Sequence, residues 1–152
     1  TVSALAAQNI GAGKYDRAKQ TLRYAMMIAI GFGLVVSILI QFIAAPVVGL
    51  FTADAAVILL GAQYIRGYIW DCIFAGVHFS FSGYFCACEK SGISFLHNLI
   101  AILCVRIPGV YLTSKIFPHT LFPMGLATAT GSLLSVIICI IAYRWLCEKS
   151  GK

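Results

Sequence analysis

The sequence predicts an all-α integral membrane protein with four transmembrane helices. Its 152 residues are 61% hydrophobic and 11% charged, whereas soluble domains are usually about 45–50% apolar and about 25% charged. Four apolar runs are long enough to cross a bilayer, and the basic residues gather in alternate connecting segments. These observations indicate that lipid surrounds most of the side chains. No low-complexity or Pro-rich linker divides the chain into separate domains.

The four apolar runs set the boundaries of the expected helices. A membrane-spanning helix needs about 20 apolar residues, because each residue advances the helix by about 1.5 Å. The runs that meet this length are Leu22–Ala45, Ala55–Ala87, Ile93–Leu112 and Met124–Leu146. We expect residues 21–147 to form this four-helix unit, followed by a tail at 148–152. Residues 1–10 are expected to end a truncated preceding helix, and 11–20 to form a loop.

The distribution of basic residues predicts the orientation of the spans. One side of the expected bundle carries Lys14, Arg17, Lys19, Arg23, Lys90, Arg144, Lys149 and Lys152, and the other side carries only Lys115. Positively charged loops stay in the cytoplasm. The loop at 11–20 and the C-terminus are therefore expected to be cytoplasmic, in a multi-pass protein of the plasma membrane. The same placement explains the net charge of +6 through membrane lipid, with no nucleic-acid partner.

Motifs for catalysis, metals and cofactors are absent from the sequence. The cysteines Cys86 and Cys88 form C-x-C and not the C-x-x-C of a zinc or redox site, and the glycine loop lacks a phosphate-binding pattern. No His, Cys, Asp or Glu grouping has metal-ligand spacing. We therefore expect no enzyme activity, no bound metal and no cofactor.

One acidic residue lies in the middle of the second expected span. A carboxylate at that depth costs a few kcal/mol or more and usually faces a cavity or a partner. If residues 55–87 form one helix, a polar stripe shares one face of it, formed by Tyr64, Tyr68, Asp71, His78 and Ser82. Asp71 is thus a candidate for binding a coupling ion or a cationic substrate. A structural ion pair with Arg66 or Arg106, or an incidental place in a cavity wall, are the alternatives.

Two further residues of the spans have both a functional and a packing interpretation. Arg106 comes two residues before Pro108, and proline can kink a helix because it lacks a backbone donor. A bent helix beside a buried charge suits a transporter, but a paired or snorkelling arginine in a packing motif fits equally. His78 is a candidate cavity residue, with a hydrogen-bonded packing histidine as the alternative.

Four ordered motifs resemble a known family of transporters. Residues 8–18 read QNIGAGKYDRA, residues 46–52 read PVVGLFT, residues 64–66 read YIR and residues 106–108 read RIP. They are similar to the Q-N-x-G-A-G-x-x-x-R-A loop, the P-x-x-x-x-F-T helix end, the Y-[LI]-[RK] and the R-[VI]-P of the multidrug and toxic compound extrusion (MATE) family. In the loop, the matching positions are Gln8, Asn9, Gly11, Gly13 and Arg17, which we expect to be structural.

The resemblance implies a fold of twelve helices in two lobes, in which these four spans are helices nine to twelve. It implies export of amphipathic, often cationic compounds in exchange for sodium ions or protons by alternating access. The N-terminal lobe of the same protein would then be a partner. Some sodium-coupled members carry an aspartate in the helix of Asp71 but a turn nearer the cytoplasm, so that role is not carried over. A lipid-linked saccharide flippase of the same superfamily and an integral membrane enzyme are the alternative functions.

Overall fold

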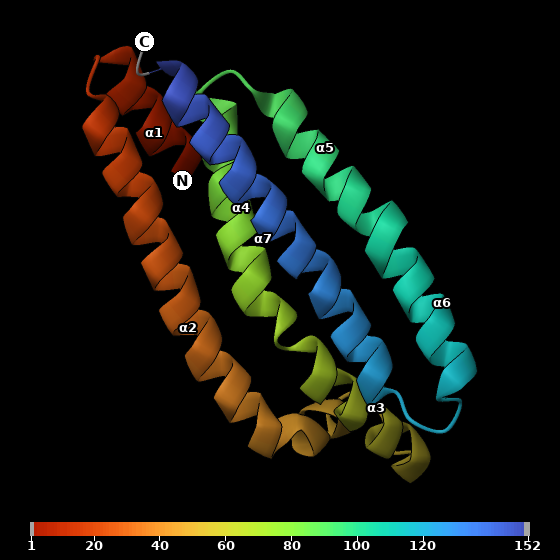
Figure 1. The fold of residues 1–152 in the computed structure, drawn as a ribbon. Coiled ribbons are helices and arrows are strands. Elements are labelled where there is room, and N and C mark those ends of the chain that lie inside the picture. The colour runs from red at the N-terminus through yellow and green to blue at the C-terminus, as the bar shows by residue number, and fades with distance from the viewer. Residues whose placement is uncertain (1, 151–152) are drawn as a thin grey trace.

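Helices account for nearly all of the structure, a computed structural model that describes the backbone of residues 2–150 and the side chains of residues 2–147. No strand occurs within this part of the chain. The elements, drawn in Figure 1, are α1 (Val2–Gly11), α2 (Tyr15–Gly49), α3 (Ala55–Tyr68), α4 (Asp71–Ala87), α5 (Ser91–Ala101), the π-helix η1 (Ile102–Arg106), α6 (Ile107–Ile116) and α7 (Phe122–Ser150).

The long helices lie side by side along one common direction (Figure 1). α4 packs against both α2 and α7, while α5, η1 and α6 pack against α7. The turn before α2, the turn between α4 and α5, and the end of α7 lie at one end of the molecule (Figure 1). The expected basic segments therefore share one end. Gly151 and Lys152 of the predicted tail lie outside the described residues, as do the side chains of residues 148–150.

Three of the helices in the described part of the chain are long and apolar enough to cross a membrane, namely Tyr15–Gly49, Ser91–Ile116 and Phe122–Cys147. The first begins seven residues before the expected Leu22, because the predicted loop at 11–20 is only a short turn between α1 and α2. The prediction of one continuous span over Ala55–Ala87 is wrong. That segment is divided into α3, of 14 residues, and α4, of 17 residues.

The division between α3 and α4 is stabilised by two polar side chains of α2. The chain turns at Ile69 and Trp70, which frees main-chain carbonyls from their regular helical partners. Gln41 Nε2 donates a hydrogen bond to the carbonyl of Arg66 at 3.1 Å. The carbonyl of Ile69 accepts from the amide of Cys72 at 3.0 Å and from Ser37 Oγ at 3.3 Å. An unsatisfied carbonyl costs several kcal/mol in lipid, so the bond from Gln41 stabilises the interruption and Ser37 adds a second donor at Ile69.

The third expected span stays continuous but contains a π-helical turn. The amide of Ile107 donates to the carbonyl of Ile102, five residues earlier. Pro108 follows directly and has no amide hydrogen with which to restore the regular i−4 bond. The proline thus helps to maintain a widened turn within a rod that runs from Ser91 to Ile116.

Helix contacts at the two ends of the bundle differ in kind. Near the basic end, apolar side chains from α1, α2, α4 and α7 form a core that includes Ala6, Leu22, Phe81, Phe85 and Cys139. At the other end, α3 crosses α7 with main chain against main chain. A Cβ on Gly125 would lie 2.5 Å from the carbonyl oxygen of Tyr64. Small residues allow such approaches where lipid removes the hydrophobic driving force between helices.

Candidate functional site

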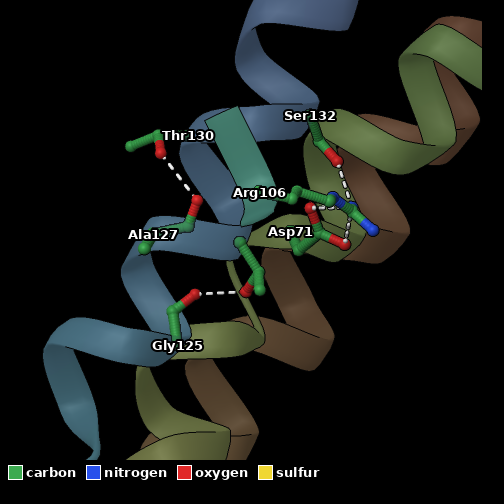
Figure 2. A network of polar contacts seen from close by, with 7 residues as sticks. Asp71, Arg106, Gly125, Ala127, Thr130 and Ser132 are labelled. Carbon is green, nitrogen blue, oxygen red and sulfur yellow. Dashed lines mark hydrogen bonds and ion pairs between the residues drawn. The ribbon is translucent and has the colours of Figure 1, made fainter. Parts of the chain in front are cut away.

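A buried ion pair joins three helices near the middle of the bundle (Figure 2). Arg106 Nη2 lies 3.1 Å from both carboxylate oxygens of Asp71 and 2.7 Å from Ser132 Oγ. The Asp71 side chain is 5% exposed and that of Arg106 is 32% exposed. The charge of the carboxylate is therefore compensated where water is scarce, while the guanidinium keeps partial access to its surroundings.

Asp71 lies where α4 begins after the interruption. It is in the first turn of α4, the end of a helix at which a negative charge is favoured. The amides of Cys72 and Ile73 donate to the carbonyls of Ile69 and Trp70. The direct hydrogen bonds to the buried carboxylate therefore come from Arg106.

Arg106 reaches the carboxylate because of two features of the neighbouring helices. It is the last residue of η1, and π-helical turns often occur at functional sites. On α7, Gly131 leaves room for the side chain, since a Cβ there would lie 2.6 Å from Arg106 Cγ. Ser132 then accepts a hydrogen bond from the guanidinium. Figure 2 shows Arg106 extending between α7 and Asp71.

A cavity of about 210 Å³ opens beside the ion pair. Its walls come from the turn after α3 and from α4, α5, η1 and α7. The polar residues that line it are Tyr68, Asp71, His78, Asn98, Arg106, Ser132 and Ser135. The cavity thus combines one compensated charge pair with neutral hydrogen-bonding groups, a lining suited to a polar or charged small molecule.

The structure brings together four of the predicted site residues and leaves three outside the cavity. Tyr68, Asp71, His78 and Arg106 line it. Tyr64 stacks on Tyr68 with ring centroids 5.7 Å apart, and Ser82 forms a hydrogen bond with Ser94. The Nε atom of Arg66 is buried without a hydrogen-bond partner. Of the two arginines considered as partners for Asp71, Arg106 is the one that pairs with it.

The predicted polar stripe is divided between two helices. Tyr64 and Tyr68 belong to α3, whereas Asp71, His78 and Ser82 belong to α4. The backbone between them, at Ile69 and Trp70, stays in the right-handed helical region. The prediction of a single helix is therefore wrong, but Tyr68, Asp71 and His78 line the same cavity.

Several residues of the site were not found from the sequence. Ser132, Asn98 and Ser135 are isolated polar residues of apolar runs, and each faces the same cavity. Gly131 precedes Ser132 and could have been recognised as a small residue beside a hydroxyl. Ser37 and Gln41, four residues apart on α2, were the available signal for a neighbouring helix with unpaired carbonyls.

The glycine-containing turn before α2 is held by local hydrogen bonds and lies away from the ion pair. Asn9 Nδ2 donates to the main-chain carbonyl of Leu5 at 2.8 Å. The main-chain carbonyl of Asn9 accepts a hydrogen bond from the amide of Lys14. Gly13 has a φ of 71°, a conformation that glycine adopts without strain. Gln8, Gly11 and Arg17 surround this turn, at the end of the bundle opposite to α3 (Figure 1).

No group of three or more His, Cys, Asp or Glu side chains within residues 2–147 is arranged to hold a metal ion. The six cysteines are free thiols. What the site offers chemically is a carboxylate, a guanidinium and several hydroxyl and amide groups around a cavity.

Three membrane-length apolar helices within the described residues define a helical membrane protein. The family model MatE matches residues 1–112, so the chain belongs to the MatE family of membrane transporters. No curated protein and no solved structure matches the chain.

Proposed function

We propose that this chain forms part of a secondary antiporter that exports amphipathic, often cationic compounds in exchange for sodium ions or protons. The observation that carries the proposal is the Asp71–Arg106 pair, which lies buried at a helix break and beside a cavity. Membership of the MatE family supports transport as the activity. The chain acts by alternating access, together with the N-terminal lobe of the same protein.

Asp71 and Arg106 give the cavity a means of responding to a cation. In the conformation described, Arg106 occupies both oxygens of the carboxylate. A cationic substrate or a sodium ion that enters the cavity competes with the guanidinium for Asp71. Arg106 is about one third exposed, so it can turn toward water when it is displaced. Binding of the cation and movement of η1 are thereby linked.

The orientation follows from the charges at the two ends of the bundle. The turn before α2 carries Lys14 and Arg17, and the turn between α4 and α5 carries Lys90. Both lie at the same end (Figure 1). By the positive-inside rule this end faces the cytoplasm, and the protein resides in the plasma membrane.

A flippase for lipid-linked saccharides is less well supported by the site. Recognition of a pyrophosphate requires uncompensated basic groups in the cavity. Arg106 lines the cavity, but its charge is compensated by Asp71. Arg66 does not line the cavity. The export of cations therefore fits the charge balance of the site better than the binding of an anionic headgroup.

Export is tested by expressing the complete transporter that contains this chain in a host whose own drug pumps have been deleted. We expect raised resistance to cationic drugs and lower accumulation of a cationic dye, and both should depend on the ion gradient. Resistance and dye accumulation that stay unchanged for every class of substrate would contradict the proposal.

The role of Asp71 is tested in the same assay with Asp71→Asn, which should abolish ion-driven export. Asp16→Asn is the matched control, because Asp16 is an exposed carboxylate in the first turn of α2. Export by Asp71→Asn with normal ion dependence would remove Asp71 from the mechanism while leaving the transport activity itself in place.

A further inference from the structure

Two histidines lie in contact between α4 and α5, beside the cavity of the ion pair. His78 on α4 is 3% exposed and His97 on α5 is fully buried. Their ring centroids are 5.6 Å apart, with the ring planes at 72°. Neither histidine belongs to the ion pair or to the four sequence motifs. The contact between them therefore has no explanation in the site described above.

The two imidazoles lack the hydrogen bonds that buried polar groups normally make. Both ring nitrogens of His97 and Nδ1 of His78 are buried, and no protein group donates to them or accepts from them. A neutral imidazole carries one donor and one acceptor, and leaving these groups unsatisfied when buried destabilises the fold. An apolar residue at either position would avoid this cost. The unsatisfied ring nitrogens therefore indicate that the histidines bind a ligand in a second conformation of the protein.

We propose that His78 and His97 form a proton-binding site whose protonation separates α5 from α4. This proposal rests on the antiporter function proposed above and identifies its coupling ion as the proton. Histidine is suited to the role because its unperturbed pKa, about 6.5, lies within the physiological range. If both rings become protonated, their positive charges repel each other. Protonation of the pair therefore favours a conformation in which the two rings, and hence α4 and α5, lie farther apart.

The surroundings of His78 contain no free partner for a protonated ring. The titratable and charged groups that act on it are His97 on α5, Asp71 on α4 and Arg106 on η1. Asp71 is already paired with Arg106, and Nδ1 of His78 is buried without a hydrogen-bond partner. We therefore propose that the proton is accepted when α5 moves away and water reaches the rings.

Movement of α5 would be transmitted directly to the ion pair. α5 continues without a turn into η1, which ends at Arg106. α5 is attached to its neighbours by few polar contacts, a hydrogen bond between Ser82 and Ser94 and one from Ser135 Oγ to the carbonyl of His97 at 3.5 Å. Displacement of α5 therefore shifts the guanidinium relative to Asp71 and changes which cation the carboxylate binds.

The proposal is tested by NMR of the full chain in lipid nanodiscs with isotope-labelled histidine, followed as a function of pH. His119 lies in an exposed loop, and its ring signals serve as a reference from outside the contact between α4 and α5. We expect the ring signals of His78 and His97 to change together, in one joint transition. Over the same pH interval the protection factors of the α5 amides, which are corrected for the intrinsic pH dependence of exchange, should fall by up to about tenfold per pH unit for each proton taken up.

Two variants complete the test. His97→Gln should remove the joint transition and the pH dependence of α5 exchange, whereas the matched His119→Gln should leave both unchanged. The proposal is overturned if His78 and His97 titrate independently of each other, if neither takes up a proton before the chain unfolds, or if the protection of the α5 amides does not follow their titration.

The outcomes also separate this proposal from that of export. A joint histidine transition in a transporter that exports nothing would remove only the proposed export activity. Export driven by sodium alone, with histidines that do not titrate jointly, would remove only the proton site.

Discussion

The two partners of the ion pair lie in the second and third expected spans, and the chain interrupts its helix differently at each of them. At Asp71 the helix is broken, and α4 begins again with the carboxylate in its first turn. At Arg106 the helix remains continuous and is widened by a π-helical turn. The short carboxylate lies at the N-terminal end of a helix, where a negative charge is favoured, whereas the long guanidinium reaches its partner from within a continuous rod.

The two interruptions also depend on different neighbours. The break is supported from α2, through Ser37 and Gln41. The widened turn depends on Pro108 in its own helix and on the space left by Gly131 of α7. Substitutions in α2 should therefore change the stability contributed at the break between α3 and α4. Substitutions at Pro108 or Gly131 should change the stability contributed at the π-helical turn.

Removal of either charge should have the largest effect, and the effect should be unequal. Arg106→Met leaves a buried, uncompensated carboxylate and should lower the free energy of unfolding by about 3–5 kcal/mol. Asp71→Asn should cost less, because the partly exposed arginine can turn toward water. Unfolding measured in lipid for both variants and for the double variant gives the coupling energy. Equal losses for the two single variants would contradict the asymmetry.

The close crossing of α3 and α7 at Gly125 should be the next most sensitive position. In Gly125→Ala the new Cβ would lie 2.5 Å from the carbonyl oxygen of Tyr64 and 2.6 Å from the amide of Tyr68. Overpacking against main chain should cost about 1–3 kcal/mol or more. Gly31→Ala is the matched control, since a Cβ there meets nothing within 4 Å, and its stability should stay the same or rise.

Loss of the hydrogen bonds from α2 should destabilise the break alone. Ser37→Ala leaves the carbonyl of Ile69 without one donor and should cost about 0.5–1.5 kcal/mol. Faster hydrogen exchange is expected around residues 69–73 and not in α5. Ser114→Ala, which removes an exposed bond to the carbonyl of Tyr111, should change neither quantity.

Restoring a backbone donor in the third span should have the smallest effect on stability and a clear effect on geometry. Pro108→Ala supplies the missing amide, so the π-helical turn can relax toward a regular helix and rotate Arg106 away from Asp71. The free energy of unfolding should change by less than about 1 kcal/mol, because the hydrogen bond gained offsets the ion pair weakened. The coupling energy between Asp71 and Arg106 should fall, and an unchanged coupling would show that the proline does not aim the arginine.

The helices could be predicted from local properties, and their interruptions could not. Apolar length and the polar segments at Asp54 and Glu89–Lys90 located the ends of most helices to within a few residues. The break at Ile69 and Trp70 has no such signal, because the side chains that donate to its carbonyls, Ser37 and Gln41, belong to another helix. Helical periodicity across residues 64–82 therefore predicted one helix where the folded chain has two.

The candidate site was partly accessible to sequence reasoning for the same reason. A charge inside an apolar run is conspicuous, so Asp71 and Arg106 could be selected, and their pairing was one of the expected alternatives. Ser132 carries no charge and lies among small and apolar residues of α7. Its contribution depends on how α7 passes Arg106, which only tertiary packing determines.

The crossing of Gly67 and Gly125 has a mechanical consequence. Since two main chains touch there with no side chain between them, the contact has no rotamers with which to absorb strain. The short α3 must then move together with the first half of α7 as one rigid body, while only two residues join α3 to α4. Any rotation of α3 and α7 relative to α4 is therefore concentrated at this two-residue joint, directly beside the carboxylate of Asp71.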